Sequence, residues 1–429
     1  MKTGKILNEV LKDIELNKEE SLEIKKEVNL FLDLIKNRIS KLKYKPEVFV
    51  GGSYAKNTMI KKKKYDVDVF LRYDKMNSNE DLSKKTAAIL KDIKEVSVVH
   101  GSRDYFRIKI NEALYIEIVP VIKVSSPKNS KNITDLSYSH VKYINKKIKN
   151  KKILDDIKIA KAFCYANGFY GAESYIKGFS GYSLELLVYH YKGFINMIKE
   201  LSKNTVKEGD KIIIDMEKKY RNKKEVLLDM NSSKLGSPII LVDPTYEQRN
   251  ALAALSEESF GRFKKVCKEF LRGPSAKYFE EEKINLIKLK KDSLKKKHEF
   301  ILIETKTKKQ EGDVAGSKLL KFYNHLGEEM IRFFDIKDRG FNYNGKQSAR
   351  YFFVVRKKDF VIYRGPSVKD AKNVKKFKKE HKVVKVNKGN LFSNEKVNFN
   401  IYEFIKKWSV KNKRKIKEMS IENIKVIDV

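Results

Sequence analysis

Hydrophobic and polar positions change their spacing several times along the first part of the chain. Apolar side chains recur every three or four positions over residues 18–40, which predicts an amphipathic helix. A second helix is expected near 79–94. Short apolar or alternating runs predict strands at 47–50, 66–71, 105–110 and 115–119. Pro120 is expected to end the last of these strands, because proline cannot donate to a strand ladder.

Beyond residue 147 the pattern becomes mainly helical and later mixed. Helices are predicted at 153–167, 182–200, 256–271, 367–381 and 401–418. Strand-like runs follow one another at 299–304, 350–355 and 359–363, with a turn at 364–366. The pattern therefore predicts an α+β protein with a mixed sheet in its head. The expected parts are a head at 1–146, a helical central domain at 147–275, an α/β body and tail at 276–400, and a helical segment at 401–429 that packs back on the central domain.

The residues of the head that can carry chemistry are a glycine turn and a pair of acids. Gly52 and Ser53 follow the first expected strand, and Asp66 and Asp68 alternate with apolar residues further on. Because side chains two positions apart on a strand share a face, the two carboxylates should lie together. The turn opens an expected helix from Tyr54, where free backbone N–H groups favour phosphate.

Two carboxylates on one strand face are costly to hold together unless a cation lies between them. Mg²⁺ prefers such hard oxygen ligands, and Glu117 on a later strand supplies a third acid. Such a set suits two ions about 3.5–4 Å apart, one activating a 3′-hydroxyl and one holding a triphosphate. A lone Asp-x-Asp pair is more often a solvated strand edge. The order of strand, glycine turn, helix and two acid-bearing strands favours the metal site.

This order resembles the DNA polymerase beta-like nucleotidyltransferase superfamily. Further stretches, in the same order, resemble the archaeal class of CCA-adding enzymes, from about residue 20 to about residue 400. They are ITDLSYSH at 133–140, ANGFYGAE at 166–173, KGFSGYSLELL at 177–187, VDP through RN at 242–250 and YRGP at 363–366. The GFSGY and VDP…RN stretches are specific to that family, whereas GGS and Asp-x-Asp are shared by the superfamily.

The resemblance implies roles for individual residues. Asp66, Asp68 and Glu117 match the metal-binding acids, although the family more often has Asp at the third position. Arg249 matches the arginine that reads the incoming base. The matches to nucleotide-contacting positions are Gly52, Ser53, Lys56, Ser137, His140, Lys161, Tyr170 and Arg249. Lys56 stands where Arg is common, and Ser137 stands where Thr is usual.

Each of these residues also has an ordinary structural reading. Lys161 could be a solvated helix lysine, Tyr170 a core residue and His140 a surface or capping histidine. The two glycines of Gly178-x-x-Gly181 are expected to serve backbone geometry or close helix packing. Glu185 is expected to be a partner of basic residues.

Charge adds a polyanionic partner to this picture. The 429 residues hold 94 Lys and Arg against 56 Asp and Glu, a net charge of +38 spread along the chain. Counterion release makes such a chain bind phosphate backbones, although a lysine-rich proteome would give the same excess. Basic segments at 288–297, 372–382 and 411–417 are the candidate grip on RNA. Read with the family resemblance, they would clamp the acceptor stem and T-arm of tRNA by shape and charge.

The remaining composition excludes several classes. Two cysteines without a CxxC pair and six scattered histidines give no disulfide framework or zinc pattern. No signal peptide and no apolar run of about 18 residues is apparent, so a cytoplasmic location and no membrane partner are expected.

The expected function is addition of C, C and A to the tRNA 3′ end from CTP and ATP, with Mg²⁺ as cofactor and no nucleic-acid template. The alternatives are another RNA 3′-terminal nucleotidyltransferase, such as a poly(A) polymerase, and an inactive RNA-binding homologue. A homodimer is left open.

Overall fold

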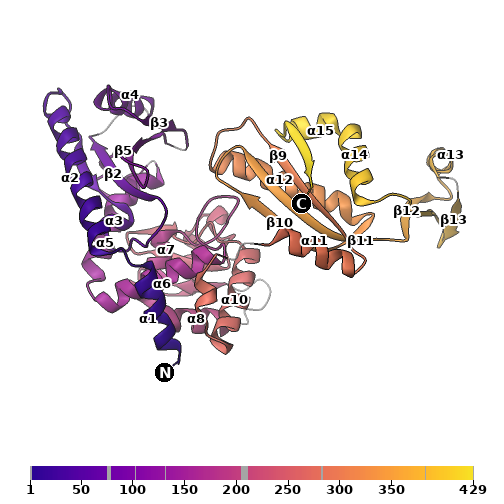
Figure 1. Cartoon of the computed structure of the whole chain (residues 1–429), viewed down its shortest axis with the longest axis horizontal. Helices are drawn as coiled ribbons and strands as arrows, with labels where there is room; N and C mark the ends of the chain where they lie inside the picture. The colour runs from indigo at the N-terminus through magenta and orange to yellow at the C-terminus, as the bar shows by residue number, and fades with distance from the viewer. Residues whose placement is uncertain are drawn as a thin grey trace. The chain divides into compact units, whose positions relative to one another are not determined.

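The computed structural model describes residues 2–74, 79–101, 103–130, 132–203, 211–281, 284–381 and 383–428. The chain divides into two compact units, Met1–Glu282 and Lys283–Val429 (Figure 1). Helices and mixed sheets occur in the chain, which confirms the predicted α+β class. No helix in the described ranges is long and apolar enough to cross a membrane.

A five-stranded mixed sheet forms the first part of the N-terminal unit. Its strands, in spatial order, are β1 (Glu47–Val50), β2 (Tyr65–Tyr73), β5 (Leu114–Ile122), β4 (Tyr105–Lys109) and β3 (Val96–Val99). The β2–β5 pair is parallel and the other pairs are antiparallel. Helices α2 (Lys18–Ser40) and α4 (Asn79–Ile89) share a hydrophobic core with this sheet. Each predicted strand of the head is present.

Two local predictions in the head are wrong. Strand β5 continues through Pro120 to Ile122, because β4 pairs with it only as far as Ile118. Beyond Ile118 this edge of β5 has no neighbouring strand within the described residues, and the Pro120 carbonyl there accepts a hydrogen bond from the Arg103 side chain. Proline has no backbone N–H, but at this position no hydrogen bond between strands is lost. The helix expected from Tyr54 is the single turn α3 (Gly52–Ala55).

Helices and short strands make up the rest of this unit. The helices are α1 (Lys2–Ile14), α5 (Ser137–Lys147), α6 (Lys151–Ala166), α7 (Gly181–His190), α8 (Phe194–Lys203), α9 (Lys223–Asp229) and α10 (Glu257–Arg272). The strands are β6 (Ile212–Ile214), β7 (Ile239–Asp243) and β8 (Tyr246–Asn250). The helix predicted at 182–200 is two helices, since Lys192 and Gly193 have φ values of 57° and 132°. Phe163, Phe194 and Phe263 are fully buried at the centre of this core.

The C-terminal unit contains a four-stranded antiparallel sheet packed against helices. Its order is β10 (Phe334–Tyr343), β11 (Ser348–Lys357), β9 (Glu299–Lys306) and β15 (Asn423–Ile427). The helices are α11 (Leu286–Lys295), α12 (Asp313–Ile331), α14 (Ile401–Lys411) and α15 (Lys413–Glu418). The terminal segment was expected to pack on the central helical domain. Within its own unit, β15 extends the sheet and α14 contributes to the hydrophobic core.

A second, smaller sheet carries the basic helix α13 (Ala371–Glu380). Its strands are β12 (Phe360–Ser367), β14 (Asn390–Lys396) and β13 (Val384–Asn387). The turn predicted at 364–366 is instead an irregularity within β12, where the register with β14 shifts. A Cβ at Gly365 would lie 2.9 Å from Leu391 and from the Phe377 ring, so glycine permits this close approach. The remaining short elements are 3₁₀ turns at Pro127–Asn129, Ile133–Leu136, Ser232–Lys234 and Ala276–Phe279.

Candidate active site

Strand β2 presents two carboxylates on one face of the head sheet. Tyr65, Val67 and Val69 point into the core, whereas the intervening Asp66 and Asp68 point away from it. Glu117 on β5 lies directly beside Asp68 in the parallel register. The alternation of the sequence therefore places the three predicted acids on adjoining strands.

The three acids crowd one another electrostatically. Burial raises the pKa of Asp68 to about 6, with Lys56 opposing the shift and Asp66 adding to it. Burial and the charge of Asp68 raise the pKa of Glu117 to about 7. Both shifts mean that the site resists negative charge unless a cation neutralises it.

Arg107 on β4 supplies positive charge to this group. Its Nη2 lies 2.8 Å from Oε1 of Glu117 and 3.2 Å from Oδ1 of Asp66. Among the residues the structure describes, no three His, Cys, Asp or Glu side chains are grouped closely enough to hold a metal ion. The carboxylates themselves suit a hard divalent cation, but Arg107 must release two of them before all three can ligate together.

The glycine turn before α3 is fitted to the acid strand. Gly52 has a φ of 61°, and a Cβ there would lie 1.7 Å from Oδ2 of Asp68. A Cβ at Gly51 would lie 2.4 Å from the Phe70 ring. Both glycines are therefore required by close packing against β2, and the Gly52 backbone lies directly beside the carboxylate.

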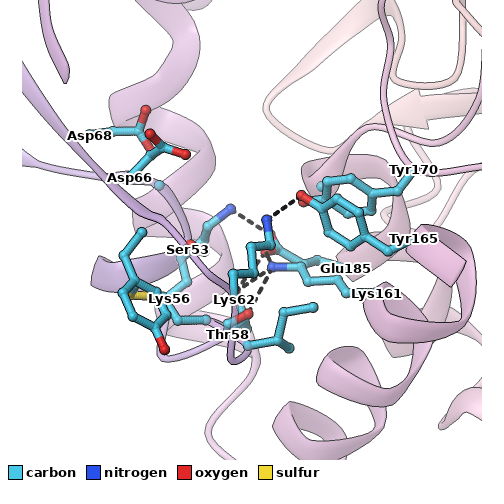
Figure 2. A pocket seen from close by; sticks show the side chains of 15 residues that line it. Ser53, Lys56, Thr58, Lys62, Asp66, Asp68, Lys161, Tyr165, Tyr170 and Glu185 are labelled. Atoms are coloured by element: carbon cyan, nitrogen blue, oxygen red, sulfur yellow. Dashed lines mark hydrogen bonds and ion pairs between the residues drawn. The ribbon is translucent and has the colours of Figure 1, made fainter. Parts of the chain in front are cut away.

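A pocket of about 270 Å³ opens beside these acids. Figure 2 shows its lining side chains, which come from α3, the segment 56–62 that follows it, β2, α6, Tyr170 after α6, and α7. Predicted site residues that line it are Gly52, Ser53, Lys56, Asp66, Asp68, Lys161 and Tyr170. Glu117, Ser137, His140 and Arg249 are not part of its lining. Ser137 is the first residue of α5 and is half-buried.

Glu185 binds two of the predicted lysines at the base of the pocket. Its fully buried carboxylate lies 2.6 Å from Nζ of Lys56 and 2.9 Å from Nζ of Lys161. The hydroxyl of Thr58 lies 2.6 Å from Nζ of Lys161 and 3.0 Å from Oε1 of Glu185. Glu185 is thus the partner of basic residues that the sequence suggested, and it connects α7 to the segment after the glycine turn.

The ionisation of this group follows from its burial and its charges. Burial lowers the pKa of Lys161 to about 8, against the attraction of Glu185. Burial would raise the pKa of Glu185, but Lys161 and Lys56 together lower it to about 2. At neutral pH the carboxylate is therefore charged and fixes both ammonium groups.

His140 and Arg249 belong to a second cluster, centred on Asp243 at the end of β7. The buried carboxylate of Asp243 accepts hydrogen bonds from His140 Nε2 at 3.0 Å, Arg249 Nη1 at 2.5 Å and Tyr182 Oη at 3.1 Å. Thr245 donates twice more, from its backbone N–H and its hydroxyl, both at 2.8 Å. Burial opposes ionisation of Asp243, but these donors lower its pKa well below its ordinary value.

Two features of this cluster point to a ligand. The His140 ring stacks on Tyr182 with centroids 3.9 Å apart, and burial lowers the pKa of this histidine. Nε of Arg249 is buried and, within the described chain, has no hydrogen-bond partner. A buried donor without a partner is rare in folded proteins, and a bound ligand is one of the groups that can satisfy it.

Sequence reasoning missed Lys62, Tyr165 and Asp243. Lys62 and Tyr165 line the pocket, but in the sequence they belong to a run of lysines and to an ordinary helix. Asp243 stands within the VDP…RN stretch, which was the available signal. The glycines of GFSGY do serve packing: a Cβ at Gly178 would lie 2.1 Å from the Phe169 carbonyl, and one at Gly181 2.6 Å from the Tyr170 hydroxyl.

Comparison with known proteins shows which families and folds this chain resembles. Residues 155–280 match the family described as tRNA nucleotidyltransferase, second domain. Residues 1–153 match the Second Messenger Oligonucleotide or Dinucleotide Synthetase domain. A cytoplasmic RNA terminal U-transferase and the Cid1 poly(U) polymerase share the fold, each with a TM-score of 0.50 and 13% identity. The matches cover 66% and 65% of this chain and 99% and 98% of those chains.

The similar curated proteins are CCA-adding enzymes. A CCA-adding enzyme of Nanoarchaeum equitans is 40% identical over 53% of this chain and 56% of its own length. One of Methanocaldococcus jannaschii is 31% identical over 64% of this chain and 61% of its own. The predicted resemblance to archaeal CCA-adding enzymes is thereby confirmed. The chain spans less than two thirds of the length of these curated relatives.

Proposed function

We propose that this chain is a tRNA nucleotidyltransferase that adds C, C and A to the 3′ end of tRNA from CTP and ATP. One observation carries the proposal: a strand with two paired acids, Asp66 and Asp68, borders a pocket lined by fixed lysines. The 40% identity to a CCA-adding enzyme supports this choice of product.

In this proposal the tRNA 3′-hydroxyl attacks the α-phosphate of the nucleotide. A new P–O bond forms as the bond to the β-phosphate breaks, pyrophosphate leaves and the hydroxyl proton passes to solvent. Asp66 and Asp68 would hold Mg²⁺, and Glu117 would join them once Arg107 releases it. When bound, the ions would stabilise the charge that develops at the reacting phosphate.

The other predicted site residues would orient the nucleotide and select its base. Ser53, Lys56 and Lys161 would contact the triphosphate, and Tyr170 would bound the sugar side of the pocket. Arg249, fixed by Asp243, would read the base, with His140 and Ser137 beside the nucleotide. No template strand is needed in this scheme, since the protein and the RNA end together select the base.

The grip on tRNA would come from the basic helices of the C-terminal unit. Lysines of α11, α13 and α15 are mostly exposed, as a phosphate-binding surface requires. We propose that these segments hold the acceptor stem and T-arm. Residue 382, at the end of the predicted segment 372–382, lies outside the described residues.

Incubation with a tRNA that lacks its 3′ end, Mg²⁺ and single labelled nucleotides tests the proposal. Two additions from CTP followed by one from ATP, and then a stop, are expected. An open-ended A tract would indicate a poly(A) polymerase instead. No extension at any metal concentration, with RNA binding intact, would indicate an inactive RNA-binding homologue.

A further inference from the structure

Three lysines line the pocket beside the acid strand, and they are not equivalent. Lys56 and Lys161 both bind the single carboxylate of Glu185, at 2.6 and 2.9 Å. Glu185 thus partly neutralises the positive charges of both lysines and fixes their positions. The third, Lys62, comes from the charged loop before β2, and its ammonium points to the Tyr165 hydroxyl and not to Glu185 (Figure 2).

Lys62 is held by aromatic groups and not by an acid. Its ammonium donates a hydrogen bond to the Tyr165 hydroxyl and lies 4.0 Å from the centroid of that ring. The Tyr165 ring stacks on Tyr170, with centroids 4.0 Å apart and planes 22° apart. Within the described chain, no carboxylate lies within ion-pair distance of Lys62. Asp66 attracts it from a greater distance, so Lys62 has no direct ion pair of the kind that Lys56 and Lys161 make with Glu185.

An incoming phosphate would compete well for this ammonium. Tyr165 offers this ammonium a neutral acceptor, because burial raises the pKa of the phenol, whereas a phosphate oxygen carries the opposite charge and adds Coulomb attraction to the hydrogen bond. A lysine side chain rotates easily about its four-carbon stem, so Lys62 can leave the tyrosine ring without movement of the backbone. Burial against the tyrosine pair lowers the pKa of Lys62 and the charge of Asp66 opposes this shift, while the side chain keeps contact with solvent, from which a phosphate would arrive.

We propose that Lys62 is a phosphate-binding residue of the nucleotide pocket, held against the Tyr165–Tyr170 pair until a nucleoside triphosphate enters. This inference rests on the proposed function, and it assigns to the loop at 61–64 a direct contact with the polyphosphate tail. The alternative is a purely structural role, in which Lys62 packs against the aromatic ring and stabilises the loop. In that case its replacement would leave nucleotide binding unchanged.

The test compares Lys62→Gln with Lys63→Gln, each in the full-length protein. Lys63 belongs to the same loop, carries the same charge and is exposed, but it is not part of the pocket lining. Calorimetry in the presence of Mg²⁺ measures binding of CTP, CDP, CMP and cytidine. We expect Lys62→Gln to lower the affinity for CTP about tenfold. The loss of affinity should be smaller for CDP, smaller again for CMP, and absent for cytidine. Lys62→Arg should restore most of the affinity for CTP.

Equal affinities for CTP in the two glutamine variants would overturn the inference. So would a loss at Lys62→Gln that is the same for cytidine as for CTP, since that would indicate a disturbed pocket. Tyr165→Phe removes the hydroxyl that competes for Lys62 and should tighten CTP binding, so weaker CTP binding by this variant would also contradict the inference. If the unaltered protein bound no CTP or ATP at all, the proposed function itself would fail, which is a different result.

Discussion

Gly52 and Asp68 fit together so closely that a methyl group at position 52 would lie 1.7 Å from Oδ2 of the aspartate. The glycine also has a φ of 61°, which strains other residues. Asp68 therefore fixes the identity of the residue at position 52, and the carboxylate can be placed only if that position has no side chain.

We predict that Gly52→Ala lowers the rate of nucleotide addition about a hundredfold or more, because it displaces Asp68 from its place on β2. Rates of single-nucleotide addition measure the effect, and circular dichroism checks that the variant is folded. Gly236→Ala is the control, since a Cβ there meets nothing within 4 Å. Wild-type rates in both variants would show that this packing does not matter to the reaction.

Replacement of Asp68 by asparagine should abolish addition while tRNA binding is retained. The asparagine keeps the size of the side chain but removes the charge that would hold a cation at the reacting phosphate. Extension rates and filter binding of tRNA, measured on the same preparation, separate the two effects. Asp33→Asn, an exposed carboxylate on α2, serves as the control. Extension by the Asp68 variant at the wild-type rate would refute the site assignment.

The local parts of this site could be predicted from sequence because they depend on spacing alone. Asp66 and Asp68 share a face because of the two-residue period of a strand, and β2 includes the predicted run. Pro120 misled the prediction, since its effect depends on how far β4 extends along its neighbour. Helix α12 was missed because its apolar residues lie in a stretch that otherwise favours strands.

The contacts that join distant segments could not be predicted in the same way. Glu185 meets Lys56 across 129 positions, and His140 meets Asp243 across 103. Arg107 lies beside Asp66 and Glu117 only because β4 follows β5 in the order of the sheet. Neither composition nor periodicity specifies such an order, whereas the family resemblance at least marked the stretch that contains Asp243.

Replacement of Glu185 should destabilise the N-terminal unit in a pH-dependent way. Glu185→Gln leaves Lys56 and Lys161 without their carboxylate, and breaking such a buried pair costs about 3–5 kcal/mol. The pKa of Glu185 falls from its ordinary 4.5 to about 2 in the folded chain. Its contribution is therefore fully present above about pH 4.5 and is lost as the pH falls through about 2. Thermal unfolding should show a large difference in Tm between variant and wild type at pH 7, and this difference should become smaller towards pH 3. A difference independent of pH would contradict this account.

Binding of tRNA should depend steeply on salt. If about six phosphates are contacted, affinity should fall roughly a thousandfold between about 50 and 200 mM salt, because each contact releases a counterion. The variant for this test neutralises four exposed lysines of α13, namely Lys372, Lys375, Lys376 and Lys379. It should bind tRNA more weakly, its affinity should depend less steeply on salt concentration, and its binding of CTP should be unchanged. The control removes the same charge from α2, at Lys18, Lys25, Lys26 and Lys36. Equal losses in the two variants would mean that net charge alone, and not α13, attracts the RNA.

The last prediction concerns the choice of base by Arg249. Its Nη1 is fixed 2.5 Å from Oδ2 of Asp243, while its buried Nε has no partner within the described chain. A guanidinium held in this way presents a donor in a set direction, which suits the ring acceptor that cytosine and adenine carry beside their amino groups. UTP and GTP carry an N–H at that ring position, so two donors would face each other. Such a mismatch costs about 1–3 kcal/mol, or roughly tenfold to a hundredfold in selectivity.

Arg249→Ala should therefore lower kcat/KM for CTP and ATP and narrow the gap to UTP and GTP. Arg249→Lys should restore only part of the selectivity, since an ammonium lacks the fork that Asp243 fixes. Asp243→Asn should narrow the gap by a smaller factor, because it keeps the shape of the cluster and loosens only the hold on the guanidinium. The measurement is the ratio of kcat/KM for CTP and UTP on tRNA ending at the discriminator base, and for ATP and GTP on tRNA ending in CC. Arg272→Ala, an exposed arginine at the end of α10, is the matched control. If the ratios stayed constant in the Arg249 variants while all rates fell together, Arg249 would bind phosphate only, and selection of the base would have to reside in other groups of the pocket.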